Sequence, residues 1–405
     1  MNTNPAEAYI FDAIRTPRGK GRKEGALHEV KPVMLLSGLL TELQKRNDLD
    51  TSTVDDIVMG VVSPVGEQGT VISKTAAITA NWDCAVAGVQ INRFCASGAE
   101  AVALAAMKVI SGWEDLVVAG GVESMSRVPM GSDIGAWVLD PAIATATGFI
   151  PQGIAADLLA TYIGLTREDV DNFAFQSQSR AKTAIEGGYF NKSLVPVKDE
   201  CGLVILDHEE YVRPDTTTKG LANLSPTFVE LGKLGFNDIA LAGFPQLDHI
   251  NHVHHAGNSS GIVDGAGALL IGSESIGKKL NLTPRCKIVC SSVTAGDPTL
   301  MLLGPELSTR KLLAKTGLSV DDIDLFEVNE AFASVPLRFM AEMKVPKEKV
   351  NVNGGAIALG HPLGASGAIL IGTLIDELDR RKLKRGIVTI CAGAGIGIAM
   401  LVERP

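Results

Sequence analysis

Apolar and polar positions alternate along both ends of the chain in short strand-like runs and longer helix-like runs. Strand-like runs cover residues 88–92, 116–119, 265–272, 324–328, 387–390 and 393–402. Two helix-like runs, 99–110 and 365–374, are apolar on nearly every side. A helix of that kind is expected between two other layers. Alternating strands and helices predict mixed α/β halves with helices on the sheet faces.

Two tetrapeptides recur in the same order, which indicates an internal duplication. VDDI at 54–57 returns at 320–323, and ASGA at 96–99 returns at 365–368. The spacing from the valine to the serine is 43 residues in the first copy (97 − 54) and 46 in the second (366 − 320). We therefore predict an N-terminal half over 1–123, completed by about 256–278, and a C-terminal half over 279–405. Residues 124–255 have no counterpart and are predicted to form an inserted loop domain with one amphipathic helix at 166–186.

Composition narrows the class of protein. The chain has 405 residues, 46% of them hydrophobic and 20% charged, which fits a globular protein larger than one compact core. The net charge of −9 supplies no basic stripe for a nucleic acid. The first ten residues do not resemble a secretory signal, and runs such as 99–110 are too short to span a bilayer. Six cysteines without a CxxC pair predict free thiols, no metal and a cytoplasmic location.

Two equivalent loops of the repeat carry a candidate nucleophile and base. Cys95 stands where a strand-like run gives way to the apolar helix, and the N–H groups of a helix N-terminus favour a thiolate. Its repeat counterpart, 360–367, contains His361. If the halves pack about a pseudo-twofold axis, the two loops approach each other, and a histidine opposite a cysteine is a nucleophile–base pair. Read alone, either residue could equally be a buried structural side chain.

Two further segments end strand-like runs with polar groups. Cys391 is followed by glycines that let backbone N–H groups face a ligand, so Gly393 is a candidate oxyanion donor. Asn329 follows the run 324–328 and opens a predicted helix, where it is either a site residue or an N-cap.

Taken together, these segments resemble the thiolase family along the whole chain. IRTP at 14–17, AGGVESMS at 119–126 and NVNGGA at 351–356 are also similar to thiolase sequence. The resemblance implies a duplicated, five-layered α-β-α-β-α architecture with an inserted loop domain. It implies an acyltransferase that cleaves 3-oxoacyl-CoA with CoA, or condenses two acyl-CoAs, through an acyl-cysteine intermediate.

The resemblance also assigns roles. Cys95 is acylated, His361 takes the thiol proton, and Cys391 moves a proton at the α-carbon. Asn329, acting through a water, belongs to one oxyanion hole, and the N–H groups of Cys95 and Gly393 form the other. The implied CoA contacts are Arg213, Ser260, Phe228, Ala331 and Phe332. Coenzyme A is the substrate, no cofactor is implied, and the expected assembly is a homodimer or homotetramer without membrane or nucleic-acid partners.

Departures and alternatives bear on specificity. Short-chain thiolases usually carry His-Met where this chain has Pro151-Gln152, which leaves room for a longer or bulkier acyl chain. Four histidines gather at 249–255, in a loop that could hold a metal or simply pack near CoA. A ketosynthase-like condensing enzyme is an alternative, although that group typically has a second histidine at the position of Asn329. A non-catalytic acyl-CoA-binding protein on the same scaffold is the other.

Overall fold

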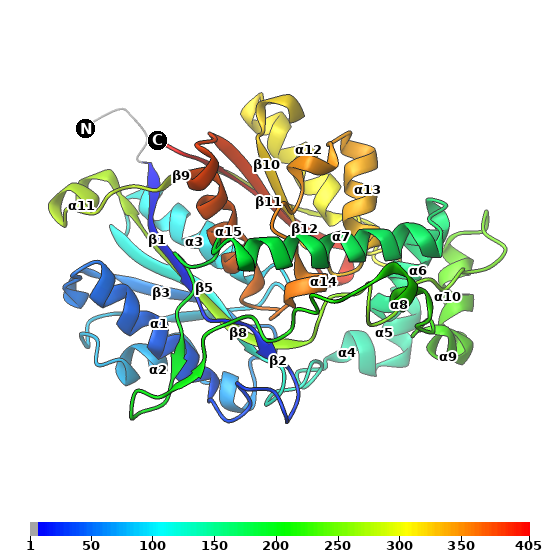
Figure 1. Cartoon of the computed structure of the whole chain (residues 1–405), viewed down its shortest axis with the longest axis horizontal. Helices are drawn as coiled ribbons and strands as arrows, with labels where there is room; N and C mark the ends of the chain where they lie inside the picture. Colours follow the sequence, from blue (N-terminus) through cyan, green and yellow to red (C-terminus); the bar gives the residue numbers. More distant parts are fainter. Residues whose placement is uncertain (1–6) are drawn as a thin grey trace.

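One mixed sheet runs through the computed structural model, which describes residues 7–405 (Figure 1). Its strand order is β10-β11-β12-β9-β1-β8-β5-β3-β4, and β2 pairs with β8 beside this path. In the N-terminal half the strands are β1 (Ala8–Arg15), β2 (Gly19–Lys20), β3 (Asp56–Gly60), β4 (Val89–Ile91), β5 (Leu116–Ser124) and β8 (Val263–Ser273). In the C-terminal half they are β9 (Cys286–Ala295), β10 (Leu325–Val328), β11 (Arg385–Cys391) and β12 (Ile396–Glu403).

The sheet is symmetric about the contact between β1 and β9. These two strands pair only over Ala8–Ile10, and from there the orders β1-β8-β5-β3-β4 and β9-β12-β11-β10 run outward with the same pattern of parallel and antiparallel neighbours. The position of β4 is taken in the second half by a single parallel bridge between Phe326 and Val350. The topology is therefore that of two similar half-sheets joined edge to edge.

Helices complete five layers around the two half-sheets. The central layer holds α3 (Ser97–Ser111) and α15 (Ser366–Arg381), which pack on each other and on strands of both halves. The outer layers hold α1 (Pro32–Arg46) and α2 (Ile72–Thr79) on one side and α12 (Gly304–Thr316) with α13 (Ser334–Met343) on the other (Figure 1). Helix α11 (Glu274–Lys279) follows β8 at the margin. The predicted α/β class is confirmed.

The central helices are longer than their apolar runs. α15 continues to Arg381 and gains a polar last turn, while α3 exposes Met107 and Ile110. The segment Phe94–Ser111 is, by length and composition, long and apolar enough to cross a membrane, contrary to the prediction from 99–110 alone. It is 61% buried, and α3 lies between the two half-sheets, so its apolar character is that of a core helix.

The inserted segment covers one end of the sheet. Its predicted amphipathic helix is confirmed as α7 (Arg167–Glu186), which begins with a capping box between Thr166 and Asp169. The sequence reading missed α6 (Gln152–Tyr162), because this helix is buried on nearly all sides and shows no polar face. The remaining elements are short: α4 (Ala136–Leu139), α5 (Pro141–Ala146), β6 (Val197–Lys198), β7 (Val204–Leu206), α8 (Thr218–Ala222), α9 (Val229–Leu231) and α10 (Asn237–Gly243). Helix α14 (Ala356–Leu359) leads from the C-terminal half toward His361.

Candidate active site

The Cys95 loop is a strained turn between β4 and α3. Phe94 has a positive φ of 48°, a conformation that bulky residues rarely adopt outside functional sites. The Ser97 hydroxyl holds the turn, because it accepts from the Arg93 N–H (2.8 Å) and donates to the Phe94 carbonyl (2.5 Å). Cys95 itself is 7% exposed, and burial raises the pKa of its thiol to about 12. The helix N-terminus was expected to favour a thiolate, but burial outweighs that effect, and the resting thiol is neutral.

Two glycines let the Cys95 loop and the His361 loop meet. A Cβ atom on Gly98 would lie 2.7 Å from the Gly364 carbonyl oxygen, and one on Gly367 would lie 2.1 Å from the Ala99 nitrogen. The first turns of α3 and α15 therefore touch backbone to backbone, which a side chain would prevent. The structure thus brings the two equivalent loops together at the centre of the molecule.

His361 is fixed through its Nδ1 atom. The Ser366 hydroxyl donates to the Pro362 carbonyl (3.1 Å), so its oxygen accepts from Nδ1–H of His361 at 2.5 Å. This tautomer leaves Nε2 without a proton, 3.3 Å from the Asn329 amide nitrogen. Burial, with a smaller contribution from the charge of Arg18, lowers the pKa of His361 to about 4. The imidazole is therefore neutral and able to accept a proton at Nε2.

Asn329, Cys391 and Gly393 lie at the ends of two adjacent parallel strands: Asn329 follows β10, Cys391 is the last residue of β11, and Gly393 follows it. The Asn329 N–H donates to the Thr389 carbonyl at 3.0 Å, which aligns the segment after β10 with β11. Asn329 does not cap a helix, because α13 begins at Ser334 with Ala333 as its N-cap. Cys391 is fully buried, and burial together with the nearby Cys95 raises the pKa of its thiol. A Cβ atom on Gly393 would lie 3.3 Å from the Phe94 ring, so this loop abuts the Cys95 loop.

A cavity of about 880 Å³ leads from the surface to His361. Four of the five predicted CoA contacts line it: Arg213, Ser260, Phe228 and Phe332. Ala331 does not line it, but its carbonyl accepts from the Ser260 N–H at 2.9 Å and so holds that wall in place. The inner end is formed by His361, Leu363 and Met125, and the latter two belong to the same buried cluster as Cys95.

The rim of this cavity is basic. Arg213 lies over the Tyr211 ring, 5.1 Å from its centroid, rather than in a surface ion pair. Lys20 and Arg22 also line the cavity, and the sequence reading missed both. The sequence signal that could have revealed them is the pair of basic residues on either side of Gly21 in an otherwise acidic chain. Three cations at one opening suit a ligand that carries several phosphate charges.

Three of the four histidines at 249–255 are held by carboxylates, and the fourth, His249, is exposed. Asp157 accepts from His252 Nδ1 at 2.6 Å and from His254 Nδ1 at 2.7 Å, and Asp171 binds His255 Nε2 at 2.8 Å. Within residues 7–405, no group of three or more His, Cys, Asp and Glu side chains is placed to hold a metal ion. The cluster instead ties the segment before Ser260 to α6 and α7.

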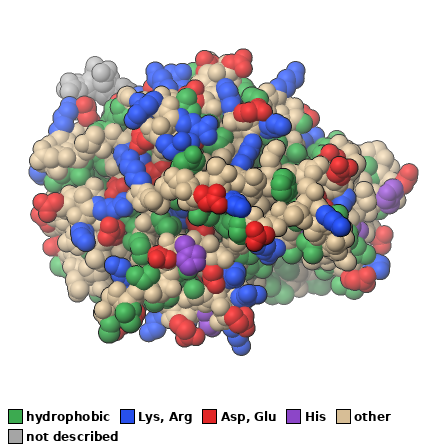
Figure 2. Space-filling view, viewed as in Figure 1, with side chains coloured by type: hydrophobic (Ala, Val, Ile, Leu, Met, Phe, Trp, Pro, Cys, Tyr) green, Lys and Arg blue, Asp and Glu red, His purple; other side chains and the backbone are tan. Residues whose placement is uncertain are grey.

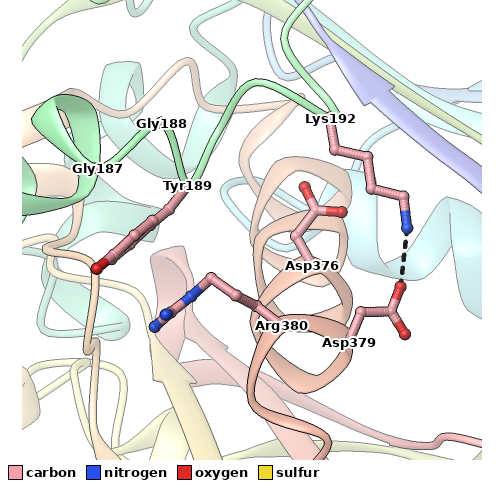
Figure 3. Close-up of a pocket in the computed structure, with 7 residues that line it drawn as sticks. All are labelled: Gly187, Gly188, Tyr189, Lys192, Asp376, Asp379 and Arg380. Atoms are coloured by element: carbon pink, nitrogen blue, oxygen red, sulfur yellow. Dashed lines mark hydrogen bonds and ion pairs between the residues drawn. The ribbon is translucent and has the colours of Figure 1, made fainter.

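A second, smaller cavity of about 380 Å³ lies between the 187–192 loop and α15 (Figure 3). Its charges are occupied: Lys192 pairs with Asp379 at 3.0 Å, and Arg380 lies over the Tyr189 ring. It contains none of the candidate site residues. On the face seen in Figure 2, Lys and Arg side chains are interspersed with Asp and Glu.

Comparison with known proteins places this geometry in a family. Residues 8–238 match the model of the thiolase N-terminal domain, and residues 282–404 match that of the thiolase C-terminal domain. The chain is 39% identical to the 3-oxoadipyl-CoA/3-oxo-5,6-dehydrosuberyl-CoA thiolase of Escherichia coli (strain K12), over 98% of this chain and 99% of that protein. It is 39% identical to the 3-ketoacyl-CoA thiolase of Aliivibrio fischeri, with the same coverage.

Solved structures similar to this chain belong to the same family. The Bacillus anthracis acetyl-CoA acetyltransferase superposes with a TM-score of 0.86 at 35% identity, covering 99% of this chain and 100% of that one. Human mitochondrial 3-ketoacyl-CoA thiolase in complex with CoA superposes with a TM-score of 0.85 at 31% identity, covering 99% and 98%.

Proposed function

Because the chain belongs to the thiolase family, we propose that Cys95, His361 and Cys391 carry out its acyl transfer between a 3-oxoacyl-CoA and CoA. The chain is a thiolase-type acyltransferase. The observation that supports this assignment of residues is the backbone contact between the two repeat loops, together with a neutral His361 and the closeness of Cys391 to Cys95.

The first half of the reaction makes the acyl-enzyme. The Cys95 thiol gives its proton to Nε2 of His361 as sulfur attacks the C3 carbonyl of the 3-oxoacyl-CoA. Since the resting pair is neutral, this transfer occurs only as the new S–C bond forms. The N–H groups of Cys95 and Gly393 are assigned to the developing oxyanion, where each donor contributes about 3 kcal/mol.

The second half releases both products. The C2–C3 bond breaks, the electron pair stays on C2, and the Cys391 S–H protonates it to give acetyl-CoA. CoA then attacks the acyl-Cys95 thioester, and its thiol proton restores Cys391. Cys95 leaves as a thiolate and takes back the proton that His361 has held, so the resting pair is restored. Asn329, through a water, is assigned to the thioester oxygen whose charge grows in the enolate. Cys95 thus holds the acyl group while Cys391 handles the proton on carbon, and the same residues serve condensation in reverse.

We expect the part of the site that receives the acyl group to favour acyl chains without a charge. A row of aromatic rings starts beside Cys95: Phe94 and Trp137 have centroids 6.2 Å apart, Trp137 and Phe149 5.0 Å, and Phe149 and Phe236 6.4 Å. Trp137 and Phe149 lie in the stretch between Arg127 and Arg167, which contains no Lys or Arg. A terminal carboxylate, as in the 3-oxoadipyl-CoA of one relative's name, would find no cation from that stretch of the chain. We therefore assign 3-oxoacyl chains with an apolar end.

A homodimer is supported by exposed apolar surface at the sheet edge. Strand β4 has a free edge, and Ile78 on α2 and Met107 on α3 are 63% and 53% exposed nearby. Sedimentation velocity tests this, because a monomer at micromolar concentration would overturn it. A cytoplasmic location remains the accompanying proposal.

One kinetic series tests the function. The protein is incubated with CoA and 3-oxoacyl-CoAs of increasing length, and we expect ping-pong kinetics, with Cys95→Ala abolishing both turnover and the acyl-enzyme seen by intact mass. Cys391→Ala should still accept an acetyl group from acetyl-CoA but fail at C–C bond formation. More than trace activity in Cys95→Ala would contradict the assignment of Cys95 as the nucleophile, whereas no thiolysis by the wild-type protein would favour a non-catalytic acyl-CoA-binding protein.

The substrate class has a matched test. 3-Oxohexanoyl-CoA and 3-oxoadipyl-CoA have the same number of acyl carbons and differ in a terminal methyl or carboxylate. We expect kcat/KM to favour the methyl by at least about 100-fold, in line with the cost of burying an unpaired charge. Equal values would show that a cation reaches the acyl chain after all.

A further inference from the structure

Glu123 is a buried carboxylate that the mechanism leaves without a role. It stands near the end of β5 and is 1% exposed. Its two oxygens accept four hydrogen bonds, all from N–H groups: Oε2 from Val62 (2.9 Å) and Gly364 (2.9 Å), and Oε1 from Ser63 (3.1 Å) and the Gln68 side chain (2.7 Å). These donors come from both halves of the duplicated fold.

One arm of this network reaches the His361 loop. Gly364 follows His361 by three residues and belongs to the C-terminal half, yet it lies in a slot built by the N-terminal half. A Cβ atom on Gly364 would lie 2.7 Å from the Gly60 carbonyl oxygen, and one on Gly121 would lie 2.0 Å from the Gly364 carbonyl oxygen. Inside this slot, the Gly364 N–H donates to Glu123. The carboxylate therefore fixes the peptide between His361 and the start of α15.

The other arm reaches the Cys95 loop. The Ser63 N–H, which donates to Glu123, shares a peptide group with the Val62 carbonyl, and that carbonyl accepts from the Asn92 amide at 2.9 Å. The same Asn92 side chain accepts from the Phe94 N–H at 2.8 Å, directly before Cys95. A continuous chain of hydrogen bonds thus runs from the carboxylate to the strained turn of the nucleophile.

The four partners define the charge of Glu123. All of them are donors, so a protonated carboxyl group would have to give up one bond and would leave its own O–H without an acceptor. Burial raises the pKa of Glu123 and the four N–H groups oppose that shift. We take the group as ionised. A glutamine in its place would turn an NH₂ group toward two N–H donors, which breaks two bonds without changing the size of the side chain.

We propose that Glu123 is a positioning residue that holds the nucleophile loop of Cys95 and the base loop of His361 in register across the two halves of the fold. This inference rests on the proposed roles of Cys95 and His361. A misplacement of about 1 Å between reacting groups costs on the order of 100-fold in rate.

The test compares Glu123→Gln with a matched control, Glu377→Gln. Glu377 is also 1% exposed and accepts from Asn353, Arg380 and Arg381, but it lies far along α15 from His361. We expect Glu123→Gln to lower kcat for thiolysis by about 10- to 100-fold, with KM for CoA within about threefold of wild type, because Glu123 does not line the cavity. Glu377→Gln should lower stability and keep kcat. A wild-type kcat in Glu123→Gln, or a loss that only follows its folded fraction, overturns the proposal.

A second readout does not depend on turnover. Alkylation of Cys95 by iodoacetamide, followed by mass spectrometry against pH, reports the nucleophile alone. The negative charge of Glu123 raises the pKa of Cys95, so Glu123→Gln should move the alkylation midpoint to lower pH, whereas Glu377→Gln should not. A midpoint that moves while turnover stays at the wild-type value shows that Glu123 acts on the charge of Cys95 alone, and overturns the proposal. If wild type shows no Cys95-dependent thiolysis, the proposed function fails, and with it the roles on which the inference rests.

The path through Asn92 is tested by a double-mutant cycle. Asn92→Ala breaks only the arm to Phe94, and we expect kcat to fall about tenfold. Because both changes act through one chain of hydrogen bonds, we expect the kcat of the double variant to be at most about twofold lower than that of Glu123→Gln. Fully multiplicative losses would show that Glu123 does not act through Asn92.

Discussion

Replacement of His361 by Asn should change how stability depends on pH. The neutral imidazole is buried in the folded chain, where its pKa is lowered from 6.5 to about 4. Between these values the unfolded chain binds a proton that the folded chain does not, so folding loses stability as pH falls. The loss begins near pH 6.5 and is complete near pH 4. Above pH 6.5 both states are neutral at this site, and nothing is lost.

The magnitude follows from the shift. A difference of one pKa unit corresponds to about 1.4 kcal/mol, so full protonation costs about 3 kcal/mol and protonation at pH 5 costs about 2 kcal/mol. Asn cannot titrate, so His361→Asn should lose about 2 kcal/mol less unfolding free energy than wild type between pH 7.5 and pH 5. Urea unfolding at the two pH values, followed by circular dichroism, measures that difference.

A control separates burial from histidine chemistry in general. His249 is exposed and, within residues 7–405, forms no hydrogen bond or ion pair, so His249→Asn replaces a histidine that is not buried. We expect this variant to lose as much unfolding free energy between the two pH values as wild type. If His361→Asn and wild type lose the same stability on acidification, His361 is not held neutral by burial, and the assignment of Nε2 as the proton acceptor fails with it.

Three further predictions concern packing, binding and tautomer. Gly367→Ala places a Cβ atom 2.1 Å from the Ala99 nitrogen, so the free energy of unfolding in urea should fall by at least about 3 kcal/mol; near-neutral stability would refute the close helix contact. Arg213→Ala should raise KM for CoA about tenfold and leave KM for an N-acetylcysteamine thioester unchanged; equal effects on both would remove Arg213 from the nucleotide end. Ser366→Ala frees the tautomer of His361 and should lower kcat 10- to 100-fold with little change in Tm, whereas unchanged kcat would make that hydroxyl dispensable.

Much of the scaffold could be predicted from the sequence because it repeats. The recurring ASGA tetrapeptide marks the first turns of α3 and α15, and the family was identified from motifs that span the chain. Helix α6 was missed because it is buried all round, so its apolar residues form no stripe. A periodic pattern reveals a helix only when one face meets water.

The electrostatics of the site were harder to predict. The position of Cys95 before a helix argued for a thiolate, but sequence does not show how much of a thiol is buried, and burial decides here. Glu123 lies 28 residues after Cys95, within a motif that sequence could match to the family but could not connect to Gly364, 241 residues further on. Long-range hydrogen bonds of this kind depend on the packing of the two halves, which no local pattern encodes.

The repeat also explains how one site obtains two different loops. Aligning ASGA at 96–99 with ASGA at 365–368 sets Arg93 opposite Pro362 and Ser97 opposite Ser366. In the first loop the serine hydroxyl is occupied by the Arg93 N–H. Proline has no N–H, so the hydroxyl of the second loop is free to accept from the imidazole of His361.

The same alignment sets Cys95 opposite Gly364. A side chain at Gly364 would collide with the Gly60 carbonyl and Glu123, so a second nucleophile cannot occupy that position without closing the slot. Because the loops share a backbone but differ at these positions, the first can present sulfur while the second presents a nitrogen base. The duplication supplies the scaffold, and the proline and the glycine make its two copies chemically unequal.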